Sequence, residues 1–194
     1  LSLHDALPIS SNHFLLNGMA DRFGFRLKTV PLRQGAAWVE EEDFLDAWGP
    51  EVGLALITWI SSTSSHRVDL PALVAHGRAM GSLIGVDITQ GAGLIPFDVT
   101  APAVDFAVST SLKWMCGTPG AGALYLAPAL IAACSPELRG WFSQDNPFNW
   151  DITRFAYAPD IRRFDAGTPG CMAAIASLPA LDWHAAQDHA AIIA

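Results

Sequence analysis

Apolar and polar residues alternate along the chain in blocks that predict strands separated by helices. Four apolar runs have the composition of strands buried on both faces: 54–60 (LALITWI), 82–89 (SLIGVDIT), 104–111 (VDFAVSTS) and 122–127 (GALYLA). A fifth strand is expected at 25–32 (FRLKTVPL). Strands that alternate with helices indicate an α/β fold with a mostly parallel sheet flanked by helices.

Helical spacing of apolar residues predicts the segments that connect and follow these strands. One helix is expected over 12–23, and another over 41–49, where acidic residues in the first turn suit the helix dipole. The helix that follows Asp69 can use this side chain as its N-terminal cap. The segment from about 171 to 194 is expected to be helical with an interruption near Pro179.

Composition and charge exclude several classes of partner. The formal net charge of −8 argues against nucleic acid and against a membrane surface, because both need clustered Lys and Arg. No apolar run reaches the ~18 residues that a membrane helix needs. Cys116, Cys134 and Cys171 are widely spaced, so we expect no metal site or disulfide framework, and a cytoplasmic protein.

Chemically distinctive residues gather where two predicted strands end. Asp87 and Gln90 follow one apolar run, and Lys113 follows the next. Ligands of parallel sheets bind outside the carboxyl ends of the strands. A buried carboxylate needs a cationic partner, and lysine seldom lies among apolar strands. Alone, Asp87 is typical of a turn and Lys113 of a surface charge. Together they favour pyridoxal 5′-phosphate (PLP), which needs a Schiff-base lysine and an acid for its ring nitrogen.

At these residues the sequence resembles the class V aminotransferases, which are fold-type I PLP enzymes and include kynureninases and cysteine desulfurases. The resemblance rests on the order D-x-x-Q, DF, S-x-K-W and G-x-G-x-LY within residues 86–126, with GWFSQDNPF and RRFDAGTP downstream. It implies the large domain of a PLP-dependent transferase.

The resemblance also implies roles for individual residues. Asp87 would bind the pyridine nitrogen and Gln90 the phenolic oxygen of PLP. Lys113 would form the Schiff base and later move the substrate proton. Ser111, with help from Thr110, would hold the phosphate.

Four further residues match positions of the family that lie downstream. Trp141 and Thr168 would reach the phosphate from the second subunit of a homodimer. Arg162 or Arg163 would bind a substrate carboxylate through two parallel hydrogen bonds. Leu112 departs from the family, because many relatives place His or Tyr directly before the lysine.

Three functional hypotheses remain open at this point. The first is a PLP-dependent aminotransferase that acts on a free amino acid. The second is a kynureninase-like hydrolase that cleaves a Cβ–Cγ bond. The third is a catalytically incompetent fragment of such an enzyme. Desulfuration is less favoured, because Cys116 and Cys134 are poorly placed for a mobile catalytic loop.

The two ends of the chain suggest a truncated sequence. Residues 1–10 (LSLHDALPIS) resemble the translation of a common sequencing adapter and are expected to be an artefact. The final residues stop inside a helical pattern without a cap. We therefore expect residues 11–140 to be part of a PLP-binding large domain. Residues 141–194 would be the end of that domain and the start of a truncated C-terminal segment.

Overall fold

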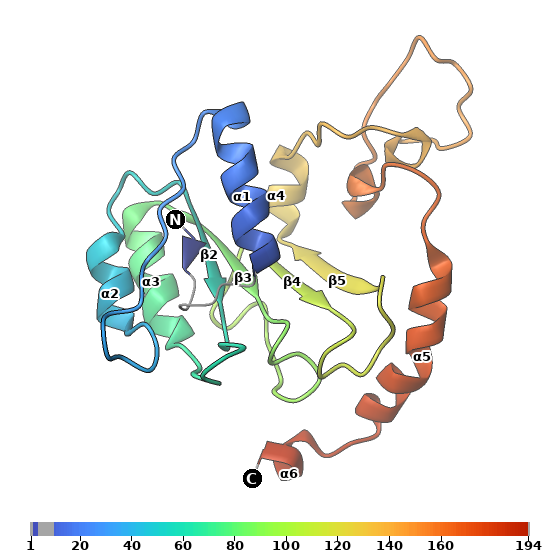
Figure 1. The fold of residues 1–194 in the computed structure, drawn as a ribbon. Helices are drawn as coiled ribbons and strands as arrows, with labels where there is room; N and C mark the ends of the chain where they lie inside the picture. The colour runs from blue at the N-terminus through green and yellow to red at the C-terminus, as the bar shows by residue number, and fades with distance from the viewer. Residues whose placement is uncertain (1, 4–9, 194) are drawn as a thin grey trace.

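The computed structural model of the chain describes residues 2–3 and 10–193, which form one five-stranded sheet with helices on its two faces (Figure 1). Residues 1 and 4–9, most of the expected artefact, lie outside the described residues.

The sheet confirms the predicted α/β class. Its strands lie in the order β1-β2-β3-β4-β5, and neighbouring strands are parallel from β1 to β4, whereas β5 is antiparallel to β4. Their bounds are β1 Ser2–Leu3, β2 Leu54–Thr58, β3 Leu83–Asp87, β4 Phe106–Thr110 and β5 Gly122–Leu126.

Six α-helices and two short 3₁₀ helices are present among the described residues. They are α1 Ser10–Phe23, α2 Glu41–Ala47, α3 Leu70–Met80, α4 Pro128–Ala133, α5 Cys171–Ala185, α6 His189–Ile193, η1 Trp141–Ser143 and η2 Ile161–Phe164. The predicted cap of α3 is confirmed, because the Ala72 N–H donates to Asp69 Oδ1 at 3.0 Å. Within the described part of the chain, no helix is long and apolar enough to span a membrane.

Two predictions about local structure are wrong. Residues 25–32 form no strand, and only Thr29 makes an isolated bridge. Pro31 lacks an N–H for a ladder, and the free edge of β2 is paired with β1 instead. Helix α5 also continues through Pro179. The carbonyl that loses its partner there belongs to Ile175, which is exposed and can be hydrated.

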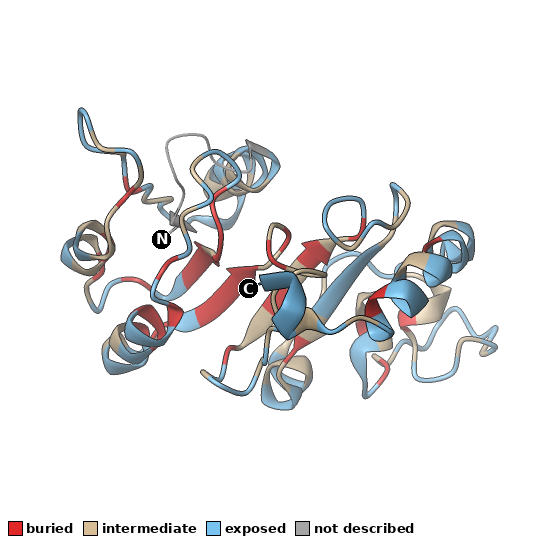
Figure 2. Ribbon diagram, turned by 90° about the horizontal axis from the view of Figure 1, so that it is seen from below, coloured by how far each residue is buried: buried red, intermediate tan, exposed pale blue. Residues whose placement is uncertain are grey.

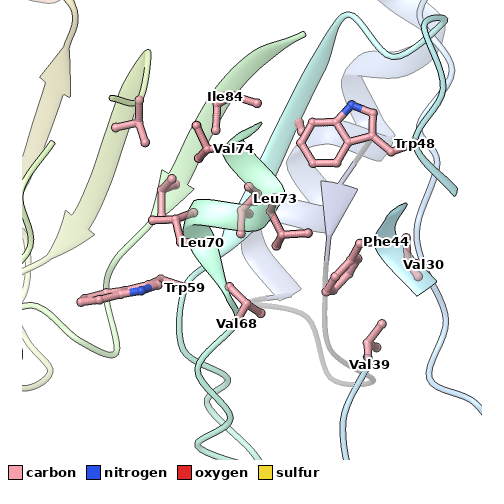
Figure 3. Close-up of a cluster of buried hydrophobic side chains, with 14 of the residues drawn as sticks. Val30, Val39, Phe44, Trp48, Trp59, Val68, Leu70, Leu73, Val74 and Ile84 are labelled. Carbon is pink, nitrogen blue, oxygen red and sulfur yellow. The ribbon is translucent and has the colours of Figure 1, made fainter. Parts of the chain in front are cut away.

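The main core lies between α3 and one face of β2 and β3 (Figure 3). Ile57 of β2 and Ile84 of β3 are fully buried and pack with Leu73 of α3. The indole of Trp48 is buried in the same cluster, and its Nε1–H donates to Ser82 Oγ at 2.8 Å. The central strands β2 and β3 are accordingly buried over most of their length (Figure 2).

Helix α1 covers the opposite face of the sheet, where the strand register brings polar residues together. Asp87, the last residue of β3, pairs with Val108, and β4 continues for two more residues to Thr110. Two residues earlier, Gly85 pairs with Phe106, whose ring fills the space that a Gly85 side chain would take. The fold therefore places Asp87 at the edge where a parallel sheet binds ligands.

We expect Gly85→Ala to destabilise the chain by about 1–3 kcal/mol, because the new Cβ would overpack the sheet. That Cβ would lie 2.0 Å from Phe106 Cζ. Urea unfolding measures the change. Gly53→Ala is the matched control, since no atom lies within 4 Å of its added Cβ, and it should change the free energy of unfolding by about 0.5 kcal/mol or less. Equal effects for the two variants would contradict this packing.

Candidate active site

A cleft of about 560 Å³ opens at the carboxyl ends of β3 and β4, below the first turn of α1. Its lining combines one carboxylate, one amine and several hydroxyl and amide groups. The lining residues are Ser11, Asn12, Ser62, Asp87, Thr89, Gln90, Val108, Ser109, Thr110, Leu112 and Lys113. Four of the residues singled out from the sequence (Asp87, Gln90, Thr110 and Lys113) therefore share one cavity.

Asp87 forms the buried end of this cleft and is only 4% exposed. Its Oδ1 accepts the Thr89 N–H at 2.9 Å, and its Oδ2 accepts Asn12 Nδ2–H at 2.8 Å. No ion pair of Asp87 occurs among the described residues. The two N–H donors offset the cost of burying the carboxylate and fix its orientation.

Lys113 lies on a tight loop, residues 111–118, that connects β4 to the turn before β5. The loop is closed by the Gly117 N–H, which donates to the Ser111 carbonyl at 2.8 Å, and by the Cys116 N–H, which donates to the Lys113 carbonyl at 2.9 Å. Cys116 adopts a left-handed conformation with φ of 55°. Lys113 is exposed and lines the cleft, and these backbone hydrogen bonds close the loop that carries it.

The turn after β3 and loop 111–118 approach each other closely, and this contact fixes the position of the loop that carries Lys113. Gly93 follows the turn that carries Gln90 and has φ of +96°. A Cβ at Gly93 would lie 2.5 Å from the Trp114 carbonyl oxygen. Only glycine tolerates both the conformation and the contact, so the turn after β3 and the lysine loop are packed against each other.

Ser111 does not line the cleft. It is 3% exposed, and its hydroxyl lies 2.7 Å from the Thr118 carbonyl and 3.0 Å from the Ala121 carbonyl. Thr110 does line the cleft, and its N–H donates to Thr89 Oγ1 at 3.3 Å. Of the two hydroxyls expected to hold the phosphate, only that of Thr110 therefore faces the cavity.

Comparison with known proteins gives the family. The sequence profile described as Aminotransferase class-V matches residues 5–194. The chain belongs to the class V aminotransferase family. This family uses pyridoxal 5′-phosphate and includes kynureninases and cysteine desulfurases, which confirms the resemblance and the cofactor expected for the family.

Two curated relatives cover much of the chain. A kynureninase of Deinococcus radiodurans is 30% identical over 181 residues, which are 93% of this chain and 41% of that protein. The uncharacterized aminotransferase YcbU of Bacillus subtilis is 32% identical over 131 residues, which are 68% of this chain and 34% of that protein. The chain therefore spans less than half the length of these relatives.

Solved structures support the fold. The cysteine desulfurase CsdA of Escherichia coli has a TM-score of 0.81 at 23% identity, with 93% of this chain and 44% of that chain covered. A cysteine desulfurase of Thermococcus onnurineus has a TM-score of 0.80 at 19% identity, with 95% and 45% covered. These likenesses confirm the PLP-dependent transferase fold of the class V family.

The residues expected at a dimeric phosphate site lie outside the cleft. Trp141 belongs to η1 and stacks on Trp150, with ring centroids 6.4 Å apart, and Thr168 lies exposed before α5. Residues 134–170, which include both side chains, extend away from the carboxyl ends of β3 and β4 before α5 returns beside the sheet (Figure 1).

The two candidate arginines of this class V chain also lie outside the cleft. Arg163 is buried and donates to the carbonyl oxygens of four residues: Ile131, Ala132, Cys134 and Ala158. It therefore satisfies the carboxyl end of α4. Arg162 Nε lies 3.1 Å from Asp160 Oδ1, and the Arg162 backbone N–H holds the pKa of that carboxyl below its usual value.

Asn12 is a site residue that the sequence did not reveal, and the only such residue that bonds to Asp87 through its side chain among the described residues. It contacts Asp87 across 75 positions of the chain. In the sequence, Asn12 appears only as a polar residue in the first turn of a predicted helix. No local pattern links it to a strand end, so the contact could be found only in the folded chain.

We expect Asn12→Ala to destabilise the chain by about 1.5–3 kcal/mol, because one donor to a buried carboxylate is lost. Asn17→Ala is the matched control, since Asn17 lies exposed on the same helix. It should change the free energy of unfolding by about 0.5 kcal/mol or less. Thermal or urea unfolding separates the two variants, and a neutral Asn12→Ala would argue against a structural role for the Asn12–Asp87 bond.

Proposed function

We propose that the chain is part of a PLP-dependent enzyme that acts on a free amino acid and holds its cofactor through Lys113. The observation that carries this proposal is the shared cleft, in which the buried Asp87 carboxylate and the exposed Lys113 amine belong to the ends of adjacent strands. Membership of the class V aminotransferase family supports the same cofactor.

The residues present fit PLP. Asp87 is buried and hydrogen-bonded but has no cationic partner among the described residues, as expected of a carboxylate that receives a protonated ring nitrogen. Gln90 and Thr110 line the same cleft and would bind the phenolic oxygen and the phosphate. When bound, PLP withdraws electrons from the α-carbon of an amino acid and weakens the bonds at that carbon.

Lys113 would then act as the acid–base group. Its Nζ would take the α-proton of the substrate and pass it, on the same face, to the C4′ carbon of the cofactor, and the closed loop 111–118 would limit the positions open to the lysine. Asp87 would stay oriented throughout, because its two N–H donors come from the protein and do not move with the substrate.

Transamination is the reaction that this cleft supports best. It needs a single base, and Asp87 and Lys113 are the only ionisable side chains among the described residues that line the cavity. The kynureninase-like alternative, hydrolytic Cβ–Cγ cleavage, also needs a group that activates water. The observation in favour of this hydrolytic alternative is the 30% identity to the Deinococcus kynureninase over 93% of this chain.

We further propose that Trp141 and Thr168 complete the phosphate site of a second subunit in a homodimer. Both lie outside the cleft of their own chain, and both are accessible enough to contact a partner. Arg162 is then the better candidate for a substrate carboxylate, since Arg163 is buried and two of its guanidinium nitrogens already donate to carbonyl oxygens. A small amino acid as substrate and a cytoplasmic location belong to the same proposal.

Covalent capture tests the cofactor assignment directly. The chain has two lysines, Lys28 and Lys113. Lys28 already donates to the Ala47 carbonyl and lies 3.8 Å from the Glu51 carboxylate. After incubation with PLP, borohydride reduction and proteolysis, mass spectrometry should find the phosphopyridoxyl group on the Lys113 peptide. Lys28→Arg should keep this label and Lys113→Arg should lose it. A label confined to Lys28 would contradict the proposal.

Product analysis separates the two reactions. If the chain transaminates, a free amino acid incubated with the PLP-loaded chain should yield its keto acid, detected by chromatography. The Lys113→Arg chain should yield none, because the only base at the α-carbon is replaced by a group that stays protonated. Anthranilate released from kynurenine would instead support the hydrolase. Capture of PLP without any product would support the catalytically incompetent fragment.

A further inference from the structure

Helix α5 contacts the rest of the molecule through a polar residue. Its sequence is mostly apolar, yet Met172, Ile175 and Leu178 are more than half exposed. Ser177, in contrast, is only 2% exposed and is one of two buried positions in the helix. Specific hydrogen bonds, and not a broad apolar face, therefore determine where this part of α5 sits.

Ser177 bonds to the end of the lysine loop. The Thr118 N–H donates to Ser177 Oγ at 2.9 Å, and Thr118 Oγ1 donates to the Ala173 carbonyl of α5 at 2.8 Å. Ser177 Oγ itself lies 2.8 Å from the Ala173 carbonyl. Thr118 is therefore held to α5 by two hydrogen bonds, and the bond from Ser177 to the Ala173 carbonyl orients the serine oxygen that accepts one of them.

Thr118 in turn bonds to the start of the same loop. Its carbonyl accepts the hydroxyl of Ser111 at 2.7 Å, and the Ser111 carbonyl accepts the Gly117 N–H at 2.8 Å. Ser111 precedes Lys113 by two residues. The hydrogen bonds thus run without interruption from α5 through both ends of the loop that carries the lysine.

The packing at this junction leaves no room for an alternative arrangement. A Cβ at Gly117 would lie 2.7 Å from Ser111 Cβ and 2.8 Å from Ser177 Oγ. The helix, the end of the loop and the start of the loop are therefore in contact at one point. A displacement of Ser177 must displace Gly117 or Ser111, because the closely packed atoms cannot absorb it.

We propose that Ser177 is a positioning residue for Lys113. It fixes the two ends of loop 111–118, so the position of α5 determines where the Lys113 amine lies in the cleft. The assignment to PLP rests on the proposed function, whereas the effect on the loop does not. Ser177 does not line the cleft, and it bonds to the loop at Thr118, whose carbonyl accepts the Ser111 hydroxyl.

Ser177→Ala tests the proposal with two readouts. In the cofactor-free chain, amide hydrogen exchange within 111–118 should become about tenfold faster, while exchange within β3 stays unchanged, because one hydrogen bond worth about one factor of ten is lost. In the presence of PLP, the rate of borohydride-trapped capture at Lys113 should fall about tenfold.

Two further variants keep the test decisive. Ser177→Cys retains the size of the side chain but accepts hydrogen bonds weakly, so it should give an intermediate effect even if the alanine variant folds poorly. Ala174→Ser, on an exposed position of the same helix, should leave both readouts at the wild-type value.

Unchanged exchange in both Ser177 variants would overturn the positioning role. Faster exchange with unchanged capture would overturn the link to Lys113. A wild-type chain that captures no PLP would contradict the proposed function, and this result is distinct because it is read from the wild type alone.

Discussion

The structure depends most on how one carboxylate is accommodated at the end of a buried strand. Asp87 is 4% exposed and closes β3, the strand that pairs with both β2 and β4. A charge in this position destabilises a fold unless donors surround it. The chain supplies them from two directions, with the Thr89 N–H from the following turn and Asn12 from α1. Helix α1 is thereby tied to the carboxyl edge of the sheet, and the cleft forms between them.

The second constraint is the shape of the loop that carries Lys113. The loop leaves β4 and returns through β5, the antiparallel strand, so both of its ends are fixed by the sheet. On one side of the loop, the Trp114 carbonyl packs closely against Gly93. On the other side, Ser111 and Ser177 pack closely against Gly117. These two glycines are needed because backbone and side chains meet more closely than any Cβ permits.

The sequence was a good guide to features that depend on local pattern. The apolar runs gave the strands β2 to β5, and their ends gave the positions of Asp87 and Lys113, because parallel strands expose their carboxyl ends on one edge. The strand expected at 25–32 does not form. A strand there would need a free edge of β2, but that edge is paired with β1, and the local sequence of 25–32 contains no information about this pairing. The interruption expected at Pro179 does not occur: α5 continues through it, and the carbonyl that loses its partner belongs to the exposed Ile175, where water can replace the lost hydrogen bond.

Features that depend on distant contacts could not be found in the sequence. The Asn12–Asp87 bond joins residues 75 positions apart. Arg163 donates to carbonyl oxygens at the carboxyl end of α4, a helix about 30 positions earlier in the chain. Ser111 resembles a phosphate ligand in its motif, but in the folded chain its hydroxyl turns toward the Thr118 carbonyl. In each case the packing of the folded chain determines the hydrogen-bond partner, and the position of a residue in a motif does not by itself determine its contacts.

The central claim is that Asp87 and Lys113 bind opposite parts of one PLP molecule. The most direct test is the dissociation constant of PLP, measured by absorbance titration for the wild type and for Asp87→Asn. The asparagine has the same shape but lacks the charge that pairs with the ring nitrogen. If the claim holds, affinity falls about 30-fold or more, as expected when one partner of a buried charge pair is removed. Equal affinity in the two proteins would contradict it.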